Sequence, residues 1–141
     1  MAGLRVVLDT NVVVAALRSR RGASFRVLSE IGRGRFEFVL SVPLLVEYED
    51  ALARARPPEI GLGDISAFLD YLCSEAHLQK IFFLWRPHLP DPKDDMVLEA
   101  AVAGNCEAIV THNRRHFEGV ATFGVKILTP FEFLRRLEVI P

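Results

Sequence analysis

The order of apolar and polar positions along the chain predicts strands that alternate with helices. The first apolar run, residues 6–10, continues without alternation, which is typical of a strand buried on both faces. Further strands are predicted at residues 36–41, 80–85, 107–111 and 125–129. Strands separated by helices favour a parallel sheet that carries helices on both faces.

The segments between these strands have helical spacing and recognisable ends. Pro43 and Pro130 stand at first helical positions, Ser24 is a candidate N-cap, and Asp64 or Ser66 is another. The predicted helices cover residues 11–19, 25–34, 44–56, 67–78, 96–104 and 130–138. Because no linker or repeat divides the chain, we expect one α/β domain that spans residues 1–141.

The composition supports a folded domain and indicates its cellular location. Half of the 141 residues are hydrophobic, which excludes a wholly disordered chain. No apolar run is long enough to cross a membrane, and the N-terminus lacks the pattern of a signal peptide. Cys73 and Cys106 have no metal-ligand spacing and are expected to be reduced. We therefore expect a cytoplasmic protein without a membrane partner.

The net charge of −1 does not indicate a nucleic-acid binder, but the choice of cations leaves that function open. All but three of the 17 cationic residues are arginines, and Arg18, Arg20 and Arg21 stand close together. A guanidinium group matches phosphate oxygens better than an ammonium group does. These arginines form either ordinary solvated faces or a basic rim around an acidic centre.

Polar and acidic residues follow several predicted strands, at the end where α/β sheets bind ligands. Each acid has an ordinary explanation, because it could cap a helix, lie on a helix surface or complement a helix N-terminus. The residues are Asp9, Thr10 and Asn11 after the first strand, Glu47 in the helix after the second, Asp91, Asp94 and Asp95 after the third, and Thr111, His112 and Asn113 after the fourth.

Taken together, these acids predict a metal site. Two like charges about 4 Å apart repel by roughly 4 kcal/mol, a large share of the roughly 5–15 kcal/mol by which a domain is stable. A divalent cation reverses the sign of that interaction. Oxygen ligands without a partnered His or Cys select a hard ion, Mg²⁺ or Mn²⁺, whereas zinc fits poorly. We therefore expect Asp9, Glu47 and the Asp94–Asp95 pair to meet around such an ion.

With these residues identified, the chain resembles PIN-domain proteins, metal-dependent ribonucleases that include the VapC-type toxins of toxin–antitoxin modules. The order and spacing of the matching motifs are specific together, although LDTN alone would be a weak signal. The motifs are VVLDTN (6–11), LSVPLLVEYEDAL (40–52), DPKDDMVLEAA (91–101), AIVTHN (108–113) and ILTPFEFL (127–134). The resemblance implies a three-layer α/β/α fold around a mainly parallel five-stranded sheet.

The resemblance also assigns roles to residues and partners. It implies hydrolysis of RNA phosphodiester bonds with Mg²⁺ or Mn²⁺, a cognate antitoxin protein and a homodimer. The matching metal ligands are Asp9, Glu47 and either Asp94 or Asp95, with Asp94 favoured and Asp91 as an outer ligand. Residues that would shape the site are Thr10, Asn11, Thr111 and Asn113, and those that would hold flanking phosphates are Arg18, Arg20, Arg21 and Arg114.

One position departs from the family pattern. Many relatives carry a fourth acid where this chain has Asn113, and His116 offers no obvious substitute. An amide brings no negative charge, so a second metal ion would be held less tightly. The principal alternative is therefore a catalytically weak PIN-like module that binds RNA or a protein. Other α/β enzymes are disfavoured, because the chain lacks both the DxD arrangement of an aspartyl-phosphate hydrolase and a GxxxxGK phosphate loop.

Overall fold

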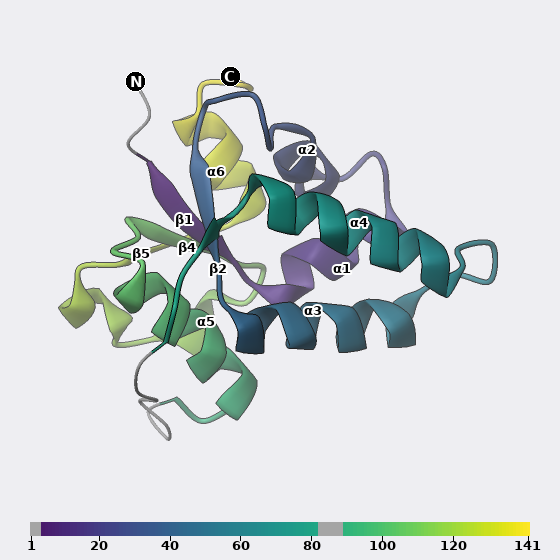
Figure 1. Cartoon of the computed structure of the whole chain (residues 1–141). Coiled ribbons are helices and arrows are strands. Elements are labelled where there is room, and N and C mark those ends of the chain that lie inside the picture. Colours follow the sequence, from purple (N-terminus) through teal and green to yellow (C-terminus); the bar gives the residue numbers. More distant parts are fainter. Residues whose placement is uncertain (1–3, 82–88) are drawn as a thin grey trace.

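A computed structural model describes residues 4–81 and 89–141 and shows a parallel sheet flanked by helices (Figure 1). The strand order is β3-β2-β1-β4-β5, and every neighbouring pair is parallel. The strands are β1 (Arg5–Leu8), β2 (Glu37–Leu40), β3 (His77–Leu78), β4 (Ala108–Val110) and β5 (Lys126–Leu128). The predicted three-layer α/β/α architecture with a five-stranded sheet is confirmed.

The described residues form six α-helices and two 3₁₀ turns. The α5 helix lies across β1, β2 and β4, while α1 packs against α2 and α3, and α2 packs against α6. None of these helices is both long and apolar enough to cross a bilayer. The helices are α1 (Thr10–Arg18), α2 (Ala23–Ser29), α3 (Val42–Ala55), α4 (Leu62–Glu75), α5 (Pro92–Ala103) and α6 (Pro130–Arg136), and the turns are η1 (Arg114–Phe117) and η2 (Val120–Phe123).

The central strand explains why an acid follows an apolar run. Val6, Val7 and Leu8 are fully buried between the neighbouring strands and the helices, and aliphatic side chains suit a strand covered on both faces. The strand ends at Asp9, whose N–H donates to the Val110 carbonyl (2.8 Å). The carboxyl ends of β1 and β4 therefore meet at the same edge of the sheet.

A close contact fixes how α5 lies on the sheet. A Cβ atom at Gly104 would lie 2.8 Å from a methyl carbon of Val39 and 2.9 Å from the Ala100 carbonyl oxygen. Only a glycine fits without displacing these atoms. Because α5 leads into β4, the helix runs back along the sheet from this contact. Its first turn therefore lies at the carboxyl edge, close to the end of β1.

The predicted start of α2 is wrong. We expected Ser24 to cap a helix over residues 25–34, but the helix covers Ala23–Ser29 and follows Gly22. The Ser24 side chain is buried, and its hydroxyl lies 2.7 Å from Nε2 of His112. Because the Ser24 hydroxyl is hydrogen-bonded to His112, it does not cap α2.

Two further boundaries differ from prediction. The α4 helix begins at Leu62, and Asp64 is its third residue, because the Asp64 carboxylate reaches back to accept the N–H of Gly61 (2.9 Å). The strand expected at residues 80–85 is found earlier, at His77–Leu78, since the chain pairs with β2 almost directly after α4 ends. Residues 82–85 of that prediction lie outside the described residues.

Candidate active site

Asp9 lies where β1 ends and α1 begins, and both of its carboxylate oxygens are hydrogen-bonded. The N–H of Thr10 donates to Oδ1 (2.8 Å), so Asp9 caps α1, and the hydroxyl of Thr111 donates to Oδ2 (2.7 Å). The residue is only 6% exposed, and burial raises the pKa of Asp9, while the two hydrogen bonds oppose that rise. The carboxylate therefore has a fixed orientation, with lone pairs left for a further partner.

Thr111, directly after β4, connects Asp9 with a polar network. Its fully buried hydroxyl accepts an N–H from the Asn11 side chain (3.3 Å) and the backbone N–H of Asn113 (3.0 Å). The side-chain amide oxygen of Asn11, Oδ1, in turn accepts the backbone N–H of His112 (3.2 Å). Because two donors point at the hydroxyl oxygen, its single proton is directed to Asp9. Asn11 and Thr111 thus surround Asp9, whereas Asn113 contributes its backbone to this network.

Asp94, in the first turn of α5, faces the same region as Asp9. It is 7% exposed, and its pKa is raised to about 6, first by burial and then by the negative charge of Asp9. The charge of Asp9 therefore acts on Asp94, although the two acids are far apart in sequence.

His116 joins this pair, and no sequence signal marked it. Its Nδ1 lies 3.3 Å from Oδ2 of Asp94, and its electrostatic interaction lowers the pKa of both Asp9 and Asp94. The residue belongs to η1, which the buried side chain of Phe117 holds against the core. A turn that no periodicity predicts therefore places an imidazole at the two carboxylates.

The neighbouring acids have other partners. Asp95 is 1% exposed, and its carboxylate accepts the backbone N–H of Leu89 (2.9 Å). Asp91 caps α5 and accepts the N–H of Lys93 (3.0 Å), although its charge still contributes to the raised pKa of Asp94. Of the two acids that the sequence left open as metal ligands, Asp94 is therefore the one that faces Asp9.

Glu47 of α3 lies at the N-terminal end of α5, where it is paired with Lys93. Its side chain is 10% exposed, and Oε2 lies 3.8 Å from Nζ of Lys93, the residue directly before Asp94. Among residues 4–81 and 89–141, no three His, Cys, Asp or Glu side chains lie close enough together to hold a metal ion as they stand. The expected meeting of Asp9, Glu47 and Asp94 around one ion therefore stays a prediction, and Glu47 is paired with Lys93.

Tyr48 explains why α3 carries Glu47 to this edge. Its ring is fully buried, and its hydroxyl donates a hydrogen bond to the carbonyl of Leu8, the last residue of β1. Burial and then the charge of Asp9 raise the pKa of Tyr48 well above its usual value, so the hydroxyl keeps its proton and remains a donor. The sequence signal for this anchor is a tyrosine in the apolar stripe of the helix, directly after the acid.

The arginines expected to hold phosphates lie in two separate segments of the chain. Arg18 ends α1, and Arg20 and Arg21 follow it in the connection to α2; all three are exposed, and no ion pair engages them within the described part of the chain. Arg114 lies after β4 and is paired with Glu132 of α6 (3.2 Å).

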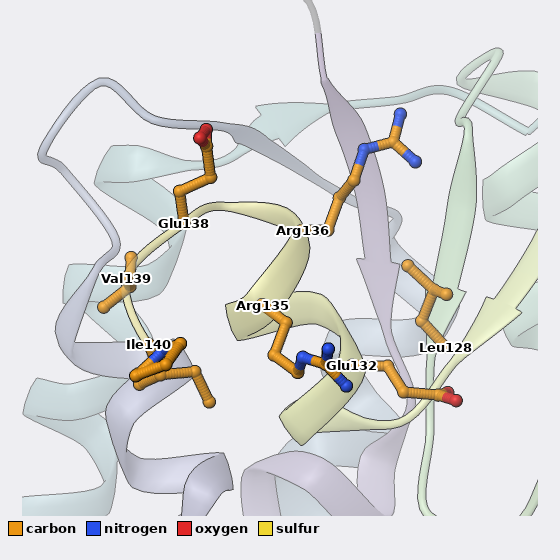
Figure 2. Close-up of a pocket in the computed structure, with 8 residues that line it drawn as sticks. Leu128, Glu132, Arg135, Arg136, Glu138, Val139 and Ile140 are labelled. Carbon is orange, nitrogen blue, oxygen red and sulfur yellow. The ribbon is translucent and has the colours of Figure 1, made fainter.

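A large hollow on the described surface does not coincide with the acids. It has a volume of about 820 Å³ and lies over α6 and the C-terminal segment, where Figure 2 shows Arg135, Arg136 and Glu138 around it. Arg136, one of its cations, is paired with Glu107 (3.7 Å). Size alone therefore does not identify the functional site, and the buried carboxylates remain the stronger candidate.

Comparison with known proteins identifies the family. The family model described as a PIN domain matches residues 5–115, the span from β1 into η1 that contains Asp9, Glu47 and Asp94. The chain belongs to the PIN-domain family.

The known proteins similar to this PIN domain are distant in sequence. No curated protein matches it. The solved structures that match include a chain of the "Crystal structure of VapBC2 from Rickettsia felis bound to a DNA fragment from their promoter". That match has a TM-score of 0.62 and 15% sequence identity, and it covers 88% of this PIN domain and 98% of the other chain. At this identity the likeness concerns the fold.

Proposed function

We propose that this PIN-domain protein is a metal-dependent endoribonuclease and the toxin of a type II toxin–antitoxin module. The observation that carries the proposal is the burial of Asp9 and Asp94, from two separate elements, so close that the charge of Asp9 raises the pKa of Asp94 to about 6. Natural domains seldom bury facing carboxylates without a function that uses them.

The donor atoms fit a hard divalent ion. Asp9 and Asp94 offer carboxylate oxygens, which Mg²⁺ and Mn²⁺ prefer, and their mutual repulsion is relieved by a cation. Glu47 would be the third carboxylate ligand if its side chain separated from Lys93, with which it is now paired. With Asn113 at the fourth acidic position, we propose that one ion is held tightly. When bound, such an ion supplies a Lewis acid that favours water as a nucleophile and stabilises negative charge on a phosphate.

The residues around the acids would keep them ready for that ion. Thr111 and the N–H of Thr10 hold Asp9 in one orientation, so little reorganisation is needed on binding. His116 presents Nδ1 at 3.3 Å from Oδ2 of Asp94, so it helps to orient that carboxylate at the edge of the site. RNA as the substrate, a cognate antitoxin and a homodimer are proposed from the family resemblance, and a cytoplasmic location from the two cysteines, which are free and lack metal-ligand spacing. The solved chain with a similar fold belongs to VapBC2 from Rickettsia felis, bound to a DNA fragment from their promoter.

A PIN-like module that binds RNA or protein without cleaving it is the second candidate. Two observations favour it: the ammonium group of Lys93 lies at Glu47, and an amide residue, Asn113, replaces the fourth acid. Such a module would bind its partner in the presence of EDTA and leave the RNA intact with either metal ion.

The experiment compares the wild-type protein with Asp9→Asn and, as a matched control, Asp70→Asn. Asp70 is exposed on α4, so the control makes the same chemical change away from the site. Each protein is incubated with structured and unstructured RNAs in Mg²⁺, Mn²⁺ or EDTA. We expect cleavage by the wild type and the control in either metal ion, and none by Asp9→Asn or in EDTA. Binding without cleavage by all three proteins would instead support the second candidate.

A further inference from the structure

We infer that a groove beside the candidate active site binds a single-stranded segment of RNA, with a base stacked on Phe131 and phosphates held by Arg20 and Arg21. The inference rests on the proposed function, because it names the form of RNA that the site accepts. It differs from that proposal in its residues, none of which touches the carboxylates.

The groove combines cations with apolar side chains. It has a volume of about 450 Å³, which is within the range of roughly 300–1,000 Å³ that small-molecule pockets have. None of the described residues that line it is acidic. The residues that define the groove are Arg20, Arg21, Arg26, Phe25, Phe131 and Ile140.

Its arginines differ in their availability. The guanidinium of Arg26 is paired with the buried carboxylate of Glu30 (3.3 Å), which Arg35 also contacts (3.2 Å), so Arg26 already has an anionic partner. Arg20 and Arg21 are exposed and make no ion pair within the described residues. Two unpaired guanidinium groups next to each other attract an anion, and they match phosphate oxygens in particular.

Hydrogen bonds connect the groove with the carboxylates. Arg21 and Gly22 directly precede α2, whose Ser24 hydroxyl lies 2.7 Å from Nε2 of His112. His112 follows Thr111, which donates its hydroxyl proton to Asp9. The N-terminal end of α2, which lines the groove, therefore lies near the edge at which Asp9 lies.

The opposite wall provides an aromatic ring. Phe131 is the second residue of α6, and it is 54% exposed although its neighbour Pro130 is buried. α6 follows β5, so its first turn lies at the same carboxyl edge of the sheet. A base can stack on such a ring only when it is unpaired, because bases in an A-form duplex are stacked on each other. The combination of ring and cations thus favours single-stranded RNA.

The experiment measures binding of a short 5′-fluorescein-labelled oligouridylate by fluorescence anisotropy in EDTA, where metal-dependent cleavage cannot occur. Phe131→Leu keeps an apolar side chain but removes the ring, and Phe131→Tyr restores a ring. Arg20→Gln with Arg21→Gln removes both free cations. Arg33→Gln is the matched control, since Arg33 is an exposed arginine in the turn after α2, at the other end of that helix.

We expect Phe131→Leu to weaken binding about tenfold, as loss of one base–aromatic stack does, and Phe131→Tyr to bind like the wild type. The double arginine variant should lower the slope of log K against log salt by about 1.4, at about 0.7 for each phosphate contact in a single strand. Arg33→Gln should leave both quantities unchanged. A duplex of the same length should bind more weakly and should not respond to Phe131→Leu.

Two results would overturn the inference. The first is that the wild type cleaves RNA in Mn²⁺ and the groove variants bind the oligouridylate as tightly as the wild type does. The proposed nuclease activity would then be supported, and the proposed RNA-binding groove would be wrong. The second is loss of binding to a labelled glutamate-rich peptide, but not to RNA, in the same variants, which would make the groove a site for an acidic protein segment. If the wild type cleaves no RNA and the groove variants lose RNA binding, the proposed nuclease activity would be overturned, while the proposed RNA-binding groove would be supported.

Discussion

Replacing Asp94 with Asn should stabilise the metal-free protein at neutral pH. The Asp94 carboxyl is buried and faces Asp9, so its charged form is disfavoured in the folded state, and its pKa rises from the ordinary value of 3.8 to about 6. In the unfolded chain both effects vanish. Above pH 6 the folded protein must therefore keep a charge that the unfolded chain accommodates more easily. Asn has nearly the same shape and carries no charge.

The magnitude follows from the two pKa values of Asp94. The folded state binds this proton more tightly, so the stabilising contribution of protonated Asp94 is complete below pH 3.8 and is lost as the pH rises to about 6. At 1.36 kcal/mol per pH unit the difference is about 3 kcal/mol. Water that reaches the rim screens part of it, so we expect Asp94→Asn to raise the free energy of unfolding at pH 7.5 by about 1–2 kcal/mol.

The assay is urea unfolding in EDTA at several pH values, followed by circular dichroism. The wild type should lose stability between about pH 4 and 6 by more than Asp94→Asn does, whereas Asp70→Asn, on the exposed face of α4, should follow the wild type. His116→Gln should move the loss to higher pH, because His116 lowers the pKa of Asp94. Equal stability of Asp94→Asn and the wild type at pH 7.5 would refute the raised pKa of Asp94 in the folded state.

Three further variants test the contacts around the carboxylates. Thr111→Val removes the hydrogen bond to Asp9 and leaves two N–H groups without an acceptor, so the free energy of unfolding should fall by about 2–4 kcal/mol; a loss below 1 kcal/mol in thermal or urea unfolding would contradict the network. Lys93→Gln removes the cation at Glu47, so Mn²⁺ measured by calorimetry should bind about two- to fivefold more tightly, and weaker binding would show that the lysine organises the site instead. Tyr48→Phe leaves a buried carbonyl without its donor and should cost about 1–3 kcal/mol in urea unfolding; unchanged stability would argue against the anchor.

The amino-acid sequence by itself predicted the fold class and the edge at which the acids lie. A strand buried on both faces has continuous apolar residues, and the residue after it must lie at the end of the strand, so Asp9 and Thr111 could be placed from local pattern alone. The helix after the third strand was predicted at residues 96–104 with Asp94 and Asp95 at its start, whereas α5 begins at Pro92 and includes both acids in its first turn.

Only the tertiary structure distinguished Asp94 from Asp95 and found His116. Successive residues on a helix project about 100° apart, so either aspartate could face the sheet edge until the packing of α5, through Gly104 on Val39, sets its rotation. His116 lies in a 3₁₀ turn that has no periodicity to read, and its contact with Asp94 depends on where that turn packs. Such side-chain directions arise from contacts between distant segments, and these contacts exist only once the chain has folded.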